Sequence, residues 1–149
     1  MVMHGAMAER HLRTKLADLL GSVDIHDLRP FEAAVEELYA TDVHFRDPMQ
    51  EVRGRDAFIQ VNRSLAKKSR SLRFEVTDTS GDDERFYLHW KLAMRPILGP
   101  ELHVEGVSRF LAVGGRVVEH LDFWDLGELM ASPLPGGRRL VHALCKPFV

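Results

Sequence analysis

Cysteine is almost absent from this chain, whose 149 residues include a single one, Cys145. One thiol excludes an internal disulfide framework and a zinc site built from several cysteines. Long apolar runs are also missing, since none approaches the ~20 residues that a membrane-spanning helix needs. The first residues lack the charged-then-apolar pattern of a signal peptide. These absences predict a cytoplasmic protein without a membrane span.

A strong charge of either sign is lacking as well. The chain has 20 Lys and Arg residues against 22 Asp and Glu residues, a formal net charge of -2 at pH 7. Such a balance gives no overall field for nucleic acid, and we expect no nucleic-acid partner. Because the chain has no spanning segment, we expect no membrane partner either. Hydrophobic residues make up 45% and charged residues 28%, as in ordinary globular proteins. Length and composition therefore predict one domain over residues 1–149.

The hydrophobic pattern predicts helices first and strands afterwards. Apolar residues recur at helical spacing over residues 11–20, from about 27 onward and from about 55 to 68. Alternation predicts strands over 42–48, from 72 onward, and in a final hairpin of residues 101–113 and 116–126, before a short helix over 138–144. This order implies an α+β fold in which a curled antiparallel sheet wraps around three helices.

Four bulky side chains, Trp90, Met94, Phe110 and Trp124, belong to the apolar face of these strands. They are large enough to line a cavity, and they could equally fill a packed core. The sequence leaves both interpretations open. The basic run over residues 67–70 is interpreted as a solvated helix end, because cations suit the last carbonyls of a helix.

Asp47 is the first candidate for chemistry. On a two-residue period it shares a face with Val43 and Phe45. A carboxylate among apolar neighbours is desolvated, which makes it a better base. The alternative is structural, with the Asp47 side chain capping the turn at Pro48.

A second candidate group comprises His120 and Asp122, which share a strand face with Trp124. An imidazole and a carboxylate two residues apart on a strand can form a hydrogen bond, and the carboxylate then fixes the tautomer of the ring. The alternative is a solvated polar face, with Leu121 and Phe123 on the core side.

The register of the last hairpin decides between these readings. A two-residue loop at Gly114-Gly115 would place Arg109 opposite His120. A three-residue loop starting at Val113 would place Ser108 there instead, and the candidate residues would then line an apolar pocket. The sequence is compatible with both.

Only the two-residue loop could bring the pair His103 and Glu105 together with His120 and Asp122 as a mixed metal site. The chain has no Gly-rich phosphate loop, nucleophile elbow or Cys–His pair. We therefore expect neither a metal nor a cofactor.

Three segments resemble the SnoaL-like and ketosteroid-isomerase-like branch of the nuclear-transport-factor-like superfamily. The first is YATDVHFRDP at residues 39–48, followed by Gly54-Arg55-Asp56 at the start of a helix. The others are GVSRF at 106–110 and GRVVEHLDFWD at 115–125. The resemblance covers about residues 12–130 and leaves 131–149 as a C-terminal extension.

The resemblance implies a cone-shaped α+β barrel, with an apolar pocket between three helices and a bent sheet, and a homodimer formed through the outer sheet face. Residues facing the pocket would be Gly106, Ser108, His120, Asp122 and Trp124. Residues facing outward, toward a partner subunit, would be His89, His103, Glu105 and Arg109.

The residues that match carry different implications. Asp47 matches the general base of the isomerases, but Gly106 stands where these have an aspartic acid, and the first helix has no matching tyrosine. Without these oxyanion donors, steroid isomerisation is not expected. Asp122 matches the acid/base aspartate of SnoaL-like polyketide cyclases. Limonene epoxide hydrolase has a similar aspartate, but the arginine and second carboxylate it also needs have no inward-facing match.

The first functional expectation is an enzyme that transfers protons without a cofactor on a small apolar carbonyl or polycyclic compound. Asp47 or Asp122 would be the base, and His120 would polarise the substrate or relay the proton. Substrate would contact Phe45, Trp90, Met94, Gly106, Ser108, Phe110 and Trp124. The alternatives are a non-catalytic module that binds an apolar ligand and a dimeric interaction domain.

Overall fold

The computed structural model describes residues 11–148. The first ten residues, on which the absence of a signal pattern rests, and Val149 lie outside this range. The elements are α1 (Leu12–Gly21), α2 (Arg29–Leu38), β1 (Tyr39–Arg46), β2 (Glu51–Arg53), α3 (Arg55–Lys67), β3 (Ser69–Gly81), β4 (Arg85–Pro96), β5 (Leu102–Val113), β6 (Arg116–Trp124), α4 (Leu126–Ala131), α5 (Gly137–Cys145) and the 3-10 turn η1 (Lys146–Phe148). Within the described residues no helix is long and apolar enough to cross a membrane.

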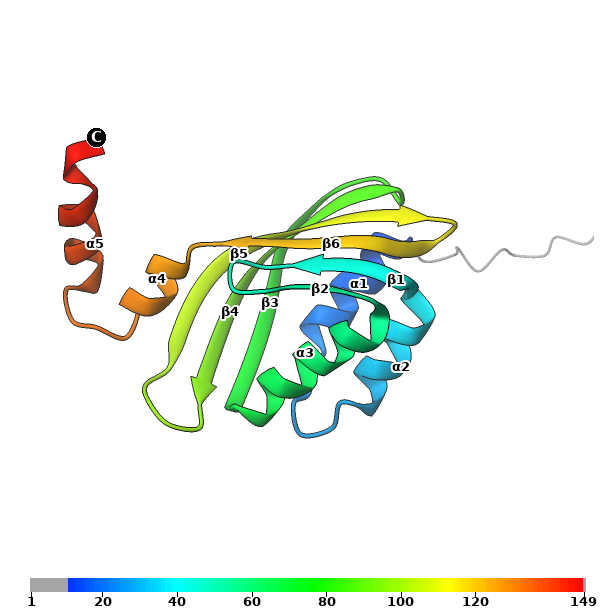
Figure 1. Ribbon diagram of the computed structural model, residues 1–149, viewed down its shortest axis with the longest axis horizontal. Helices are drawn as coiled ribbons and strands as arrows, with labels where there is room; N and C mark the ends of the chain where they lie inside the picture. Colours follow the sequence, from blue (N-terminus) through cyan, green and yellow to red (C-terminus); the bar gives the residue numbers. More distant parts are fainter. Residues whose placement is uncertain (1–10, 149) are drawn as a thin grey trace, which may run out of the picture.

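The predicted α+β fold is confirmed. A curved, unclosed sheet with the strand order β2-β1-β6-β5-β4-β3 covers α1, α2 and α3 (Figure 1). One strand pair departs from the antiparallel arrangement, because β1 runs parallel to β6. These strands are about 70 residues apart in sequence and share no hairpin, so no tight turn forces them to be antiparallel.

The three predicted helices form close to their expected positions. Pro30 lies in the first turn of α2, where a missing N–H costs nothing. The Asp27 carboxylate accepts the backbone N–H of Arg29 at 3.2 Å and its guanidinium at 2.8 Å, which stabilises the start of the helix. Apolar stripes from these helices meet the concave face of the sheet in the core, where Leu16, Val35 and Phe86 are fully buried.

Three short elements were not predicted, namely β2, α4 and the 3-10 turn η1. The sequence does carry a signal for α4, because Asp125 is followed three positions later by Glu128. The Asp125 side chain accepts the backbone N–H of Glu128 at 3.0 Å and caps the helix. Helix α4 packs against β5 at one end of the sheet, and α5 extends beyond it (Figure 1).

Neither register expected for the last hairpin is correct. The turn is the two-residue loop Gly114-Gly115, and both glycines have positive φ, at 59° and 77°. Val113 pairs with Arg116, but the register shifts between Leu111 and Ala112, so that an extra residue of β6 bulges out of the ladder. Ser108 therefore lies opposite Asp122, and Phe110 opposite His120. The bulge turns both candidate side chains of β6 to the concave face, as the family resemblance implied.

Candidate functional site

A cavity of about 150 Å³ lies between the concave face of the sheet and the helices. Its lining is mostly apolar, and it includes Leu19 of α1, Phe31 of α2, Leu65 of α3 and Val104 of β5. Polar side chains that also line it are Tyr39, Asp47, Gln50, Asn62, His120 and Asp122. The cavity thus brings a few polar groups into an apolar space, as ligand pockets do.

His120 and Asp122 form a hydrogen-bonded pair in the cavity wall. The Nε2 atom of His120 lies 2.8 Å from Oδ1 of Asp122, and these side chains are 4% and 18% exposed. The Ser108 hydroxyl donates to the same Oδ1 atom at 2.5 Å. Among residues 11–148, the other carboxylate oxygen of Asp122, Oδ2, has no hydrogen-bond partner. One oxygen is therefore held by the protein, and the other is available to a ligand.

Tyr39 orients His120 from the opposite side. Its hydroxyl lies 3.0 Å from Nδ1 of His120. Burial raises the pKa of the Tyr39 hydroxyl well above its usual value, and the negative charge of Asp122 raises this pKa further. The phenol therefore stays protonated. Where it donates to Nδ1, the remaining ring proton of His120 is on Nε2, facing Asp122. Because both ring nitrogens are engaged, we assign His120 to positioning Asp122.

Trp90 continues this hydrogen-bond chain across the sheet. Its indole N–H donates to the Ser108 hydroxyl at 2.9 Å. The ring crosses Gly106 so closely that a Cβ atom there would lie 2.5 Å from Cη2 of the indole. Gly106 is thus required for Trp90 to lie flat on the sheet, and Ser108 links the buried indole to Asp122.

Asp47 also lines the cavity, but its carboxylate is used within the turn that follows β1. Oδ1 accepts the backbone N–H groups of Met49 at 2.7 Å and Gln50 at 3.0 Å, and Oδ2 accepts the Gln50 amide at 2.9 Å. This is the capping arrangement weighed as the alternative for Asp47. Both oxygens of Asp47 already have protein donors, whereas one oxygen of Asp122 has none among residues 11–148.

The seven residues expected to contact substrate fall into two groups. Phe45, Trp90, Met94 and Trp124 line the cavity. The other three, Gly106, Ser108 and Phe110, lie behind its wall: the first two are covered by Trp90, and the Phe110 ring stacks on Phe86 at 4.8 Å. Of the four bulky residues of the strands, Trp90, Met94 and Trp124 therefore line the cavity. The fourth, Phe110, belongs to the packed core.

Sequence reasoning missed the roles of Tyr39, Phe58 and Asn62. Tyr39 begins β1 directly after α2, and its ring stacks on Phe58 of α3 at 4.9 Å between centroids. Asn62, one turn after Phe58, also lines the cavity. Tyr39 stood in the first segment of the family resemblance, but a local pattern does not show that it reaches His120, 81 positions away.

The outward-facing set lies on the convex side and forms ion pairs within the chain. His89 pairs with Glu105 at 2.8 Å, and Arg109 with Glu119 at 3.2 Å. His103 and Glu105 are thus on the opposite face from His120 and Asp122, so the mixed metal site is not assembled. The described part of the chain contains no group of three side chains suited to holding a metal ion.

Comparison with known protein families identifies the family of this chain. The sequence profile of the SnoaL-like domain matches residues 19–120, which include β1, α3 and most of the sheet. The chain belongs to the SnoaL-like family. No curated protein sequence matches it significantly.

Solved structures of this SnoaL-like protein's relatives share its fold at low sequence identity. A candidate SnoaL-like polyketide cyclase from Jannaschia is 18% identical, with a TM-score of 0.70 over 83% of this chain and 92% of that one. A protein from Catenulispora acidiphila with a ketosteroid-isomerase-like fold, in complex with trimethylamine, is 14% identical, with a TM-score of 0.68 over 83% and 93%. An epoxide hydrolase from M. tuberculosis, similar to limonene epoxide hydrolase, is 14% identical, with a TM-score of 0.65 over 89% and 96%. Identities this low establish the fold alone.

Proposed function

We propose that this SnoaL-like protein is an enzyme that transfers protons without a cofactor on a small apolar carbonyl or polycyclic compound, with Asp122 as the base. One observation carries the proposal: Asp122 lines an apolar cavity and has one carboxylate oxygen without a hydrogen-bond partner among residues 11–148, while its other oxygen is held by His120 and Ser108. A base fixed in this way is oriented before substrate arrives.

The chemistry follows from this arrangement. Oδ2 of Asp122 takes a proton from a carbon beside a carbonyl group, and the electron pair of the C–H bond moves toward the carbonyl oxygen to give an enolate. In an isomerisation, the protonated Asp122 returns the proton to another carbon. In a cyclisation, the enolate carbon attacks a second carbonyl, and the proton goes to the oxygen of the new alkoxide. His120 and Ser108 hold Oδ1 throughout.

Donors for the enolate oxygen come from residues not used by the known isomerases. Trp124 lies two positions from Asp122 on the same face of β6, and its indole N–H has no partner within residues 11–148. Asn62 donates one amide hydrogen to the Phe58 carbonyl at 2.9 Å and retains a second. Either group would stabilise the negative charge in the low dielectric of the cavity.

Deuterium exchange tests this function without knowledge of the natural substrate. A panel of apolar ketones and diketones is incubated with the protein in D₂O, and loss of the proton beside the carbonyl is followed by NMR. We expect catalysed exchange for at least one compound that the protein binds. Binding across the panel without exchange would contradict the proposal.

A non-catalytic module that retains an apolar ligand is the second candidate. One observation favours it: Gly106 replaces the acidic donor of the isomerases, and the Tyr39 hydroxyl is occupied by His120. Native mass spectrometry of the purified protein distinguishes the two, because a retained ligand together with no exchange supports the binding module. An epoxide hydrolase is less favoured, since no arginine of residues 11–148 lines the cavity.

Tyr39→Phe tests the hydrogen bond that orients His120. The variant keeps the ring stacking on Phe58 but leaves the buried Nδ1 atom of His120 without its hydrogen-bond partner, which costs about 1–3 kcal/mol of stability at pH 8. The pKa of Tyr39 is raised in the folded state, so its contribution is complete below the unfolded value of about 10 and falls as pH rises further. Urea unfolding should therefore show the gap between wild type and variant narrowing above pH 10. A gap that is constant with pH would contradict this assignment.

We also propose that the protein forms a homodimer through its outer sheet face. Tyr87 of β4 and Phe123 of β6 are 37% and 47% exposed on that face, beside charges that are already paired within the chain. Sedimentation at micromolar concentration should give twice the 17.0 kDa mass of the chain, and Phe123→Glu should give the monomer. Wild-type protein that sediments as a monomer would exclude the dimer.

A further inference from the structure

Helix α5 presents an apolar face that nothing in the described chain covers. Leu140, Leu144 and Phe148 of the α5–η1 segment are 59%, 69% and 89% exposed. The helix packs mainly against α4 and η1 and stands away from the sheet (Figure 1). Nine residues are too few for a stable helix alone in water. An outside surface that covers this face would stabilise it.

The corner between α4 and α5 fixes the direction of this apolar face. Gly137 packs against the backbone of Ala131, where a Cβ atom would clash with the carbonyl oxygen. The N–H of Leu134 donates to Ala131 O at 3.0 Å, and the N–H of Gly137 donates to Leu134 O at 2.9 Å. Gly136 turns the chain with a φ of 73°. These contacts fix the direction in which helix α5 leaves α4, and its apolar face is exposed.

A second apolar projection lies at the same end of the molecule, in the loop between β4 and β5 (Figure 1). Ile97 and Leu98 in this loop are 48% and 86% exposed. The N–H of Ile97 donates to Lys68 O at 3.0 Å, which places the loop beside the basic end of α3. The exposed cations adjoining this loop in sequence or through that bond are Lys67, Lys68, Arg70 and Arg95.

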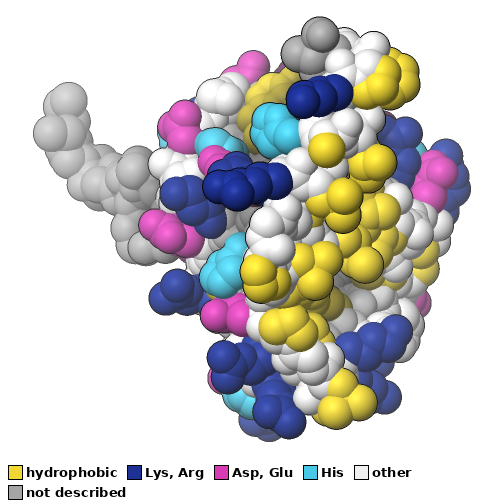
Figure 2. Space-filling view, turned by 90° about the vertical axis from the view of Figure 1, so that its left-hand side faces the viewer, with side chains coloured by type: hydrophobic (Ala, Val, Ile, Leu, Met, Phe, Trp, Pro, Cys, Tyr) yellow, Lys and Arg dark blue, Asp and Glu magenta, His cyan; other side chains and the backbone are white. Residues whose placement is uncertain are grey.

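Positive charge also accompanies α5. Residues 126–148 contain three Lys and Arg residues and one acidic residue, Glu128, which leaves 17 against 21 in the rest of the chain. The cations Arg138, Arg139 and Lys146 occupy the side of the helix opposite Leu140 and Leu144 at helical spacing. Figure 2, which views this end, shows hydrophobic side chains gathered in a band with Lys and Arg along its edges. Acidic residues also lie at this end: Glu101 follows the β4–β5 loop, and Glu75, Glu105 and Glu128 line one surface hollow beside α4.

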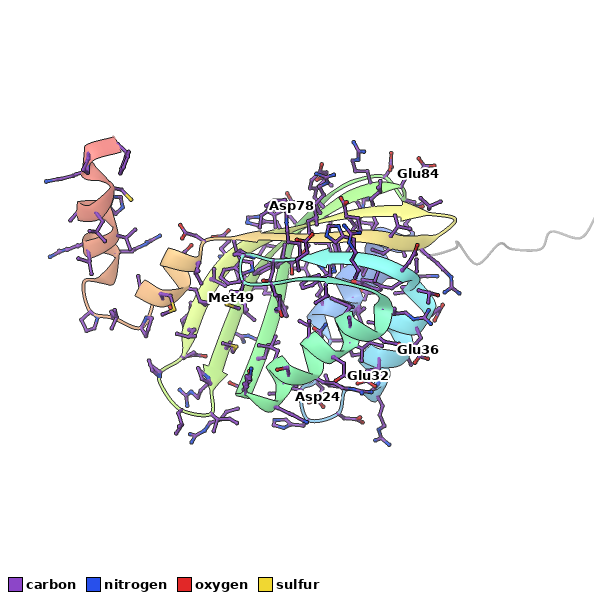
Figure 3. The ribbon with its side chains drawn as sticks, in the orientation of Figure 1. Asp24, Glu32, Glu36, Met49, Asp78 and Glu84 are labelled. Atoms are coloured by element: carbon purple, nitrogen blue, oxygen red, sulfur yellow. The ribbon has the colours of Figure 1, made fainter. Side chains whose placement is uncertain are left out.

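The lining of the cavity extends to the same end. Met49, at the tip of the β1–β2 hairpin, is 62% exposed and also lines the cavity, as does Leu129 of α4. Figure 3 shows Met49 on the side of the molecule that carries α4, away from the β5–β6 hairpin. An apolar ligand that enters here passes the two apolar projections.

We infer that this end of the molecule docks on an anionic lipid surface. The exposed apolar side chains of the two projections would enter the interface between headgroups and acyl chains: Leu140, Leu144, Phe148, Ile97 and Leu98. The cations beside the β4–β5 loop would bind lipid phosphates, and those on the polar side of α5 would add attraction to the anionic surface. The sequence predicted no membrane partner because it has no spanning segment, and peripheral docking needs none. This contact would let apolar ligands pass between the bilayer and the cavity without crossing water.

A lipid surface explains more of these features than a second copy of the chain does. A second copy could cover α5, but it would not account for a separate projection at the β4–β5 loop with its own cations. Both projections lie at one end of the molecule (Figure 1), the end that also carries the cavity-lining residues Met49 and Leu129.

Vesicle flotation tests the inference with the full chain. We expect wild-type protein to float with vesicles of equal parts phosphatidylglycerol and phosphatidylcholine, and not with phosphatidylcholine alone. The double variant L140E/L144E should lower the bound fraction about tenfold or more, because both side chains are exposed and their loss removes apolar contact with the bilayer. The variant I97E/L98E should also weaken binding, and R138E/R139E should remove the preference for anionic vesicles.

Val113→Glu is the matched control, because Val113 is 67% exposed at the β5–β6 turn, at the opposite end of the molecule (Figure 1). It should bind vesicles like wild type, and circular dichroism should show all variants folded. Absence of wild-type binding to anionic vesicles, or equal loss in the control, would overturn the inference. If wild-type protein did not bind vesicles and L140E/L144E sedimented at half the mass of wild type, α5 would instead contact a second copy of the chain. The assay uses no substrate, so its outcome is independent of the proposed proton transfer.

Discussion

Asp122→Asn should lower the rate of carbon-proton exchange about 100- to 10,000-fold, the usual contribution of a positioned general base. The amide cannot accept the proton, but it keeps the size of the side chain and can still hydrogen-bond with His120 and Ser108. Ligand affinity should therefore change much less than the rate. Exchange measured by NMR, with binding of the same compound by calorimetry, separates the two quantities.

Asp47→Asn is the contrasting variant in this experiment. The two carboxylates both line the cavity, but both oxygens of Asp47 accept donors from Met49 and Gln50. Asparagine supports the same kind of turn, so the exchange rate should fall far less than in Asp122→Asn. Equal losses in the two variants would mean that the carboxylates act together, and a wild-type rate in Asp122→Asn would exclude it as the base.

Gly106→Asp should unfold the sheet around Trp90 rather than create an isomerase. The substitution restores the acidic residue that the isomerases have, but the indole occupies the space: an added Cβ would lie 2.5 Å from Trp90 Cη2 and 2.9 Å from the Phe123 carbonyl oxygen. Gly106→Ala alone should cost about 1–3 kcal/mol through overpacking. The aspartate should cost more, because it also buries a charge without a partner.

Urea unfolding measures this effect, and Gly21→Ala provides the control. Gly21 ends α1, and a Cβ there would meet nothing within 4 Å. That variant should be neutral or slightly stabilising, by up to about 1 kcal/mol, because alanine favours the helix and restricts the unfolded chain. If Gly106→Ala were equally neutral, Trp90 would have room to move, and its bond to Ser108 would not depend on the glycine.

The features that depend only on residues close together in the sequence were predicted well. The stripes of α1, α2 and α3 and the alternation of β3 to β6 follow from spacing alone, because side-chain periodicity is a property of the isolated helix or strand. A hydrogen bond between His120 and Asp122 was one of two interpretations that the sequence allowed, since they lie two positions apart on one strand. Even α4 had a readable signal, in the cap from Asp125 to Glu128.

The functional roles were less predictable where they depend on distant parts of the chain. The sequence offered Asp47 as a candidate base, and the structure shows that its carboxylate accepts hydrogen bonds within its own turn. Gly106 and Ser108 were expected to contact substrate, but Trp90 lies over them, because a side chain 16 positions earlier fills the space that the glycine leaves. Both outcomes depend on which atoms arrive next to each side chain, which its sequence neighbours do not determine.

The sequence by itself determined the helices, the strands, the acidic and imidazole side chains of β6 and the family to which they are similar. Only the tertiary structure decided that β1 runs parallel to β6, that a bulge turns His120 and Asp122 inward, and that Tyr39 reaches His120. The physical reason is range: backbone preference and side-chain spacing act over a few residues, whereas strand pairing and cavity shape result from the packing of the whole chain.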